Sequence, residues 1–199
     1  MCQIVLDHRR RRLSNAELLD HRAVHSGALE YGRQRARIVS AAASNRRKGQ
    51  PALSPDGRMV AYAADLRGPI GLMVTDLDTG QTVNLVEGVA ASHENPRWSA
   101  DGRQLLFSST RDDPMRTRMD VFVMNADGSG VRNLSRHPHE DFDARWAADG
   151  RWVVFTSLRT GTGQLYAIDL ASGLTHRLTE HGSHDMEPIP SPVPATGPH

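Results

Sequence analysis

The sequence is short of cysteine and of long apolar stretches, and both shortages exclude classes of protein. Cys2 is the only cysteine, so the chain has no internal disulfide and no cysteine-based zinc site. No apolar run approaches the roughly 18 residues that a membrane-spanning helix needs. The N-terminal apolar stretch at residues 4–6 is too short for a secretory signal, and four arginines follow it. If Met1 is the natural start, these features predict a cytoplasmic protein.

The formal net charge of +1 conceals an uneven distribution of charge. Residues 1–48 contain eleven Lys and Arg side chains against four Asp and Glu, whereas residues 49–199 contain thirteen against nineteen. A basic segment ahead of a mildly acidic body can contact nucleic acid, an anionic lipid surface or the body itself. No aromatic residues interleave the basic run and no nucleic-acid motif surrounds it, so nucleic acid is not the favoured partner. We expect residues 1–48 to form a solvated arm that is partly helical or disordered.

One short pattern occurs three times along the chain. Residues 51–58 (Pro-Ala-Leu-Ser-Pro-Asp-Gly-Arg) are followed by the similar segments 96–103 and 144–151, and the Asp-Gly-Arg steps lie 45 and 48 residues apart. A period of about 40–50 residues is typical of repeat architectures, in which one repeat cannot bury its apolar faces alone. Asp-Gly predicts a hairpin turn, because glycine adopts positive φ at little cost and aspartate bonds to nearby backbone amides.

Each copy contains four apolar runs that have the length of strands. The runs are rich in Val, Leu, Phe, Tyr and Met and are too short for helices. The predicted strands are 52–54, 59–63, 71–76 and 82–85 in the first copy, 95–99, 104–108, 120–125 and 131–134 in the second, and 145–147, 152–157, 164–169 and 175–178 in the third. Trp98 and Trp146 share one repeat position, as do Tyr62, Phe107 and Phe155. We expect these aromatic side chains to fill the space between neighbouring sheets.

The two ends of the chain hold less regular sequence. Residues 14–17 (Ser-Asn-Ala-Glu) fit a capping box, and the apolar spacing after them predicts a short helix near residues 15–25. Residues 28–40 are compatible with helix or strand, and the strand alternative lies at 35–39. Residues 187–192 resemble the opening strand of a fourth repeat that lacks its Asp-Gly turn. Residues 193–199 are a Pro-rich tail that we expect to be disordered.

The repeated segments resemble the WD40-like (PD40) repeat of the TolB family. The resemblance is carried by residues 54–58 and 99–103, by the later segments 74–80 and 123–128, and by 168–173 with 177–179 in the third copy. It covers about residues 50–192 and implies an all-β fold. That fold is a partial β-propeller of three four-stranded antiparallel blades at about 50–91, 92–139 and 140–183. The propeller region, 49–192, would include the start of a fourth blade.

The resemblance also implies a location and a role. TolB-like propellers are usually periplasmic and serve as docking platforms for proteins in envelope assemblies, so the chain is periplasmic if Met1 is not its natural start. The family's closed ring has about six blades, and propellers close with typically 4–8. Three blades leave an open arc with exposed edge strands. A homodimer of two three-bladed halves would close a six-bladed ring; otherwise the chain is a fragment.

The loops between the copies carry most of the histidines. In a propeller these loops return from an outermost strand to the next innermost strand, so they lie on one face around the central channel. The binding residues predicted on this inter-blade loop face are His93, Glu94, His139, Glu140, Asp141, His184 and Asp185. Imidazole and carboxylate groups that converge from different blades can hold Zn²⁺ or Mn²⁺. The candidate metal ligands are His93, His139 and His184.

Three functions are compatible with these features. The leading interpretation is a non-enzymatic module without a cofactor that binds a protein or peptide over the inter-blade loop face. The first alternative is a metal-dependent channel-site enzyme that acts, like certain lyases of similar repeat sequence, on acidic saccharides. The second is a truncated propeller without independent function. A serine peptidase is excluded, because the Gly-x-Ser-x-Gly motif of the peptidases that carry such propellers is absent.

Overall fold

The structure of the chain is a computed structural model, and it describes residues 29–31, 34–36, 48–65, 68–180, 182 and 184–189. These residues form strands, turns and loops, and they contain no helix. No membrane-spanning helix is therefore found in the described part of the chain. The helix expected near residues 15–25 and the tail at 193–199 lie outside the described residues.

Three four-stranded antiparallel sheets follow one another along the chain. Within each sheet the strands pair in sequence order, so each copy of the repeat forms one blade, and the predicted all-β partial propeller is confirmed. The first blade contains β3 (Lys48–Leu53), β4 (Met59–Asp65), β5 (Ile70–Asp76) and β6 (Thr82–Asn84). The second contains β7 (His93–Trp98), β8 (Gln104–Ser109), β9 (Asp120–Asn125) and β10 (Arg132–Asn133). The third contains β11 (Asp141–Trp146), β12 (Trp152–Ser157), β13 (Gln164–Asp169) and β14 (Thr175–Arg177).

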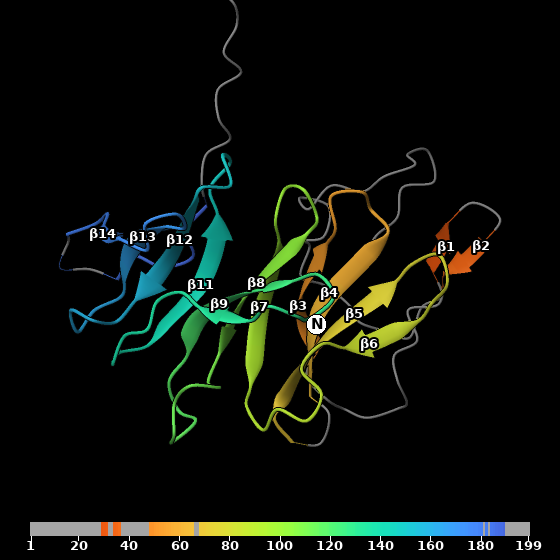
Figure 1. Cartoon of the computed structure of the whole chain (residues 1–199), viewed down its shortest axis with the longest axis horizontal. Helices are drawn as coiled ribbons and strands as arrows, with labels where there is room; N and C mark the ends of the chain where they lie inside the picture. Colours follow the sequence, from red (N-terminus) through yellow and green to blue (C-terminus); the bar gives the residue numbers. More distant parts are fainter. Residues whose placement is uncertain are drawn as a thin grey trace, which may run out of the picture.

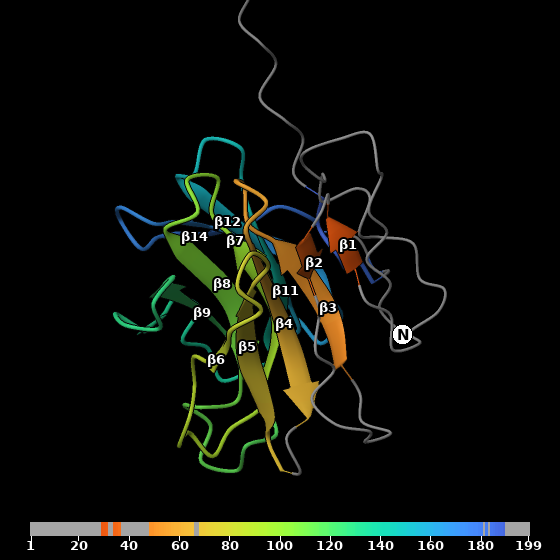
Figure 2. The same cartoon turned by 90° about the vertical axis from the view of Figure 1, so that its right-hand side faces the viewer.

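The blades are arranged as neighbouring layers. Figure 1 shows them side by side in sequence order, and Figure 2, seen from the side of the first blade, shows them one behind another. Among the first strands of the blades, β7 contacts both β3 and β11. A separate two-stranded sheet of β1 (Leu29–Tyr31) and β2 (Gln34–Ala36) lies in the segment whose sequence is compatible with helix or strand.

The Asp-Gly turn joins the first two strands of each blade. In the first blade, Asp56 accepts hydrogen bonds from the Ser54 hydroxyl at 2.6 Å and from the Arg58 amide at 3.0 Å. Gly57 has a φ of 74°, which only glycine adopts without strain. The second blade repeats these contacts. The third blade retains the hydrogen bond from the Arg151 amide to Asp149 but has Ala147 in place of the serine. These residues therefore build turns.

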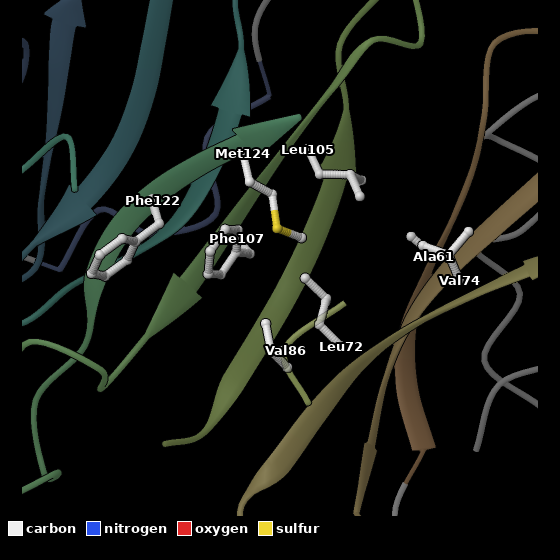
Figure 3. Packing of buried hydrophobic residues seen from close by; sticks show 8 residues of the cluster. All are labelled: Ala61, Leu72, Val74, Val86, Leu105, Phe107, Phe122 and Met124. Carbon is white, nitrogen blue, oxygen red and sulfur yellow. The ribbon is translucent and has the colours of Figure 1, made fainter. Parts of the chain in front are cut away.

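Two apolar clusters join the blades. Figure 3 shows the cluster between the first and second blades, where Leu72 and Val86 lie opposite Phe107 and Met124. The cluster between the second and third blades contains Leu106, Val121, Val123, Ala144, Val153, Phe155, Tyr166 and Ile168. Because each cluster takes side chains from two sheets, a blade buries its apolar faces only against its neighbours.

The repeated phenylalanines lie where the sequence predicts. Phe107 and Phe155 are completely buried, one in each cluster between blades. Tyr62 shares their repeat position but belongs to neither cluster, because it lies on the face of the first blade that points away from the second. The Tyr62 hydroxyl lies 3.3 Å from the Thr75 hydroxyl oxygen.

The repeated tryptophans connect the first strands directly. The indole nitrogen of Trp98 donates a hydrogen bond to the Ala52 carbonyl oxygen of the preceding blade at 3.0 Å. Trp146 makes the same contact with the Arg97 carbonyl oxygen at 3.1 Å. Each tryptophan packs against the cluster between its own blade and the preceding one. Both indoles therefore hold neighbouring blades together, as the sequence predicts.

Every first strand is bent at the same place. The pairing register shifts within β3, β7 and β11, and at the bend Asn95 and Asp143 have φ values of 54° and 53°. This left-handed backbone costs most residues other than glycine roughly 1–2 kcal/mol, and Asn and Asp tolerate it better than other side chains do. Glu187 also has a φ of 55°, and the adjacent Pro188 is buried as Pro96 is. The described residues 184–189 therefore repeat the backbone bend of the first strands.

Candidate functional site

Three of the seven predicted binding residues occupy one register position. His93 and Asp141 open β7 and β11, and Asp185 holds the equivalent place in the fourth repeat. The Asp141 amide donates to the Met119 carbonyl oxygen at 2.8 Å, and the Asp185 amide donates to that of Gly163, also at 2.8 Å. The three residues share a backbone position, but their side chains have different surroundings.

His93 is buried between the first and second blades and does not face solvent. Its exposed fraction is 0%, and its ring lies 5.9 Å from that of Phe107. Nδ1 lies 3.2 Å from the Ile70 carbonyl oxygen, and Nε2 is buried without a hydrogen-bond partner. Burial lowers the pKa of His93, and the positive charge of Arg111 lowers it further. A neutral, enclosed imidazole of this kind is part of the core.

Asp141 forms a buried ion pair in the third blade. Its carboxylate is completely buried and lies 3.1 Å from the guanidinium of Arg159. That guanidinium also stacks on the Tyr166 ring, with 4.4 Å between the guanidinium carbon and the ring centroid. The ion pair connects the start of β11 to the loop after β12, so Asp141 has a structural role in this blade.

The remaining histidines lie at the surface. His139 is exposed, and its ring stacks on that of His137 at 5.5 Å. His184 is exposed and accepts a hydrogen bond from the Gly163 amide at 3.0 Å. The structure thus places His93, His139 and His184 in three different settings: a core, a loop surface and a backbone contact.

No group of three or more His, Cys, Asp or Glu side chains within the described ranges is placed to hold a metal ion. Metal binding by His93, His139 and His184 stays a prediction. Calorimetric titration of chelator-treated protein with Zn²⁺ and with Mn²⁺ tests it, with His139→Ala and His184→Ala as comparison variants. Heat that these variants abolish would support a site, and no heat would end the idea.

The bends in the first strands bring together a set of charged and polar side chains that we call the first-strand cluster. Asn95 donates a side-chain hydrogen bond to the Asp143 carboxylate, which links β7 to β11. Both residues sit on the left-handed backbone of the bend, where strain is retained only if the surrounding structure enforces it. The cluster consists of Glu94, Asn95, Arg97, Glu140, Asp143, Arg145 and Glu187.

Burial and mutual repulsion affect the acids of this cluster. Burial raises the pKa of Glu94, and the Asp143 carboxylate raises it further. Burial also raises the pKa of Asp143, to which the charge of Glu187 contributes. The pKa of Glu140 is raised by burial and by the charge of Glu94. Two of the predicted residues, Glu94 and Glu140, are therefore brought together with acids from other strands.

Two arginines of the cluster are held in the same way on adjacent strands. Arg97 and Arg145 are half-buried, and each donates to the carbonyl oxygen of the residue before it, at 2.8 Å and 3.1 Å. Burial and the charge of Arg145 lower the pKa of Arg97 to about 10, and burial lowers that of Arg145. Neither arginine forms an ion pair within 4.0 Å among the described residues.

Sequence reasoning missed these two arginines, although a signal for them was present. Each arginine directly precedes the repeated tryptophan, in Pro-Arg-Trp and Ala-Arg-Trp. Because neighbouring strand residues point to opposite sides, a residue next to an inter-blade tryptophan faces away from the interface with the preceding blade. A charged residue repeated at that position indicates a polar face along the first strands. With carboxylates, guanidinium groups and an amide, this face can recognise a polar peptide.

Comparison with known proteins identifies the family of these blades. Residues 32–195 match the model of the PD40 family, described as the TolB beta propeller domain. The chain is 40% identical over 55 residues to the Tol-Pal system protein TolB of Syntrophus aciditrophicus (strain SB), a match that covers 28% of this chain and 11% of that protein.

Solved structures share the fold. TolB from Acinetobacter baumannii aligns with a TM-score of 0.57 at 27% identity, over 78% of this chain and 37% of that one. An oligogalacturonate lyase in complex with manganese aligns with a TM-score of 0.52 at 17% identity, over 69% of this chain and 43% of that one. The second likeness shows the fold alone. The chain spans less than half the length of each of these three proteins.

Proposed function

Because the chain belongs to the TolB β-propeller (PD40) family, we propose that it is a non-enzymatic module that binds a protein or peptide. The binding surface is the inter-blade loop face together with the first-strand cluster beside it. One observation carries the proposal: Arg97 and Arg145 are half-buried and adjacent, yet they have no carboxylate within ion-pair distance among the described residues. The charges of Asp143 and Glu187 act on both arginines from a longer distance. A desolvated charge without a direct ion pair is costly for folding alone, and a bound partner would compensate it.

The family resemblance supports an envelope location for this module. One relative is named as a protein of the Tol-Pal system, so we propose a partner from an assembly of that kind and a periplasmic location. The cytoplasmic expectation depended only on the first residues of the sequence, and no observation supports it.

A second copy of the chain is also a proposed partner, because two three-bladed halves would complete a six-bladed ring. Light scattering tests this part of the proposal separately. A mass of two chains supports it, and a mass of one chain together with a cooperative melt contradicts it.

Site-specific photo-cross-linking tests the binding surface. A photo-reactive amino acid at Glu94 should capture one partner in cells, and mass spectrometry identifies that protein. The same amino acid at Val83, which is 58% exposed on the outer strand β6, is the matched control and should not capture it. Capture that is equal from both positions would contradict the proposed surface.

Calorimetry with the identified partner then tests the arginines. The double substitution of Arg97→Gln and Arg145→Gln should weaken binding at least about tenfold, because each removes a charged contact, and a lost charged contact is worth about 1.5–3 kcal/mol. Arg132→Gln, on the exposed outer strand β10, is the matched control and should leave the affinity unchanged. Unchanged affinity in the double variant would refute the role of the arginines.

A further inference from the structure

The second blade has the longest connection between a second and a third strand. Residues 110–119, which we call the β8–β9 loop, join these two strands, whereas residues 66–69 and 158–163 join the equivalent strands of the other blades. The β10–β11 loop, residues 134–140, is the inter-blade loop that follows. The two loops lie at the same end of the blade, because the strand that follows the second loop begins with the amide bonded to Met119 at the end of the first. Long loops on a rigid scaffold are a common place for binding residues.

A buried carboxylate organises the β8–β9 loop. The Asp113 side chain is 5% exposed and accepts hydrogen bonds from the Thr117 amide at 2.7 Å and from the Arg118 amide at 3.0 Å. It also pairs with the Arg118 guanidinium, at 3.0 Å. That guanidinium donates in turn to the Pro138 carbonyl oxygen of the β10–β11 loop. The two loops are therefore attached to each other as well as to their own strands.

Each loop presents one exposed arginine on strained backbone. Arg116 and Arg136 have φ values of 55° and 41°. An arginine side chain lacks the short local hydrogen bonds through which asparagine and aspartate tolerate this left-handed conformation. Both side chains are exposed, and neither guanidinium forms an ion pair within the described part of the chain. Such strain persists only where the surrounding structure enforces it, and it is concentrated at binding sites and active sites.

The groups beside these arginines favour a peptide over a membrane as the partner. Met115 in the β8–β9 loop is 78% exposed, and the exposed Asp112 carboxylate accepts a hydrogen bond from the Asn133 side chain at 2.9 Å. An extended anionic surface would meet this carboxylate as well as the arginines. A peptide can instead place single carboxylates on the guanidinium groups, which bind them in a bidentate manner, and can lay an apolar side chain on the adaptable methionine.

We propose that the β8–β9 and β10–β11 loops form a docking surface for an acidic segment of a partner protein. Carboxylates of the segment pair with Arg116 and Arg136, and one of its apolar side chains covers Met115. Because the β10–β11 loop belongs to the inter-blade loop face, this inference rests on the proposed function and names the chemistry of the partner at these loops. The first-strand cluster is a separate contact.

Arrays of short synthetic peptides test the proposal. One array holds acidic peptides with interspersed apolar residues, and the matched array replaces every Asp and Glu by its amide. The full chain should bind members of the first array and none of the second. Fluorescence anisotropy with a bound acidic peptide should show at least about tenfold weaker binding by the double variant Arg116→Gln with Arg136→Gln.

Arg103→Gln is the matched control, because Arg103 is exposed at the opposite end of the same blade, directly before β8. This variant should bind the peptide as the wild type does. Absence of binding to all acidic peptides, or equal affinity in the double variant, overturns the proposal. Binding to phosphatidylglycerol vesicles that the double variant abolishes, without binding to acidic peptides, would identify a membrane as the partner and also overturns it.

Thermal unfolding gives a readout that binding does not share. Arg116→Gly removes the strain together with the guanidinium, so it should weaken peptide binding and leave the melting temperature unchanged or raise it. A fall in the melting temperature would mean that the arginine serves the fold, which contradicts the proposal.

Cross-linking from Glu94 separates this inference from the proposed function. If Glu94 captures a partner whose affinity the double variant at Arg116 and Arg136 leaves unchanged, the proposed function holds and the inference fails. If Glu94 captures no partner and no acidic peptide binds, both fail.

Discussion

Three residues at one repeat position show how the surroundings of a residue decide its role. His93 is enclosed beside an aromatic ring, Asp141 is paired with Arg159, and Asp185 has a buried oxygen without a partner. The backbone is placed in the same way, so the differences come from the residue itself and from the groups around it. A buried charge is stable only when another group compensates it, so a buried carboxylate beside a cation and one without a cation affect the stability of the fold in opposite directions.

The burial of His93 should make the stability of the protein depend on pH. Since the pKa of His93 is lowered in the folded state, the folded chain binds fewer protons than the unfolded chain, whose histidines titrate near about 6.5. Stability is retained above this pH and lost as the pH falls below it. Denaturant unfolding at about pH 7.5 and about pH 5.5 should show a loss that is about 1 kcal/mol larger in the wild type than in His93→Gln.

The exposed His139 provides the control for this measurement. His139→Gln should follow the wild type at both pH values. Carboxyl groups with raised pKa values, such as Glu94 and Asp143, stabilise the fold on acidification, but they contribute equally to all three proteins and cancel in the comparison. A His93→Gln variant with the pH dependence of the wild type would contradict the prediction.

The ion pair of Asp141 should contribute to stability much more than an exposed pair does. Asp141→Asn leaves the Arg159 guanidinium, whose side chain is 16% exposed, without its counter-charge, and should lower the free energy of unfolding by about 3 kcal/mol. The Arg58–Asp78 pair is exposed, with 64% and 47% of its side chains accessible, so Asp78→Asn should have no measurable effect. Urea unfolding of both variants checks this, and equal losses would contradict it.

At the scale of the strands and turns, the three Asp-Gly hairpins form a natural comparison. Ser99 donates to Asp101 at 2.6 Å and accepts a hydrogen bond from the Gln104 amide at 2.9 Å. The first blade has the same pair of contacts through Ser54, whereas the third has Ala147 at this position. The third turn keeps its shape without the hydroxyl, because the aspartate and glycine are sufficient to form the turn.

Restoring the hydroxyl should therefore stabilise the third hairpin. Ala147→Ser should add the two hydrogen bonds seen at Ser99 and raise the free energy of unfolding by about 1 kcal/mol. Ser99→Ala, the reciprocal change in the second blade, should lower it by about the same amount. Denaturant unfolding of the two variants measures both effects. A destabilised Ala147→Ser protein would show that the two turns are not equivalent.

At the scale of the whole molecule, the blades depend on their neighbours, because each apolar cluster is shared by two sheets. Phe107 lies in the cluster of the first two blades, and Phe155 lies in the cluster of the last two. In an array of this kind, stability is a sum of the blades and of the contacts between neighbours. A substitution that weakens one interface should therefore cause the blade at that end of the array to unfold first.

Two matched truncations test this prediction. Phe107→Ala and Phe155→Ala should each lower stability by about 3 kcal/mol or more, because each leaves a cavity in a buried cluster. Hydrogen exchange measured by mass spectrometry should show the larger loss of protection in the first blade for Phe107→Ala and in the third blade for Phe155→Ala. Uniform loss of protection in both variants would mean that the blades unfold as one unit.

The sequence by itself determined the number of blades, their turns and the aromatic contacts between them. These features depend on local rules: Asp-Gly forms a turn wherever it occurs between strands, and apolar runs of strand length pair with their neighbours. The short strands of β1 and β2 lie in a segment whose sequence is compatible with helix or strand, because it has no strong periodicity. The helix near residues 15–25 stays a prediction.

Only the tertiary structure decided what the candidate site contains. The linker histidines are conspicuous in the sequence, yet His93 is enclosed in a core. Arg97 and Arg145 are inconspicuous in the sequence, where each precedes a tryptophan, yet they are neighbours on adjacent strands. The unpartnered oxygen of Asp185 is likewise invisible in the sequence, since it depends on a side chain that another strand must bring. Burial and pairing are relations between strands that lie far apart along the chain, and a local pattern cannot specify them.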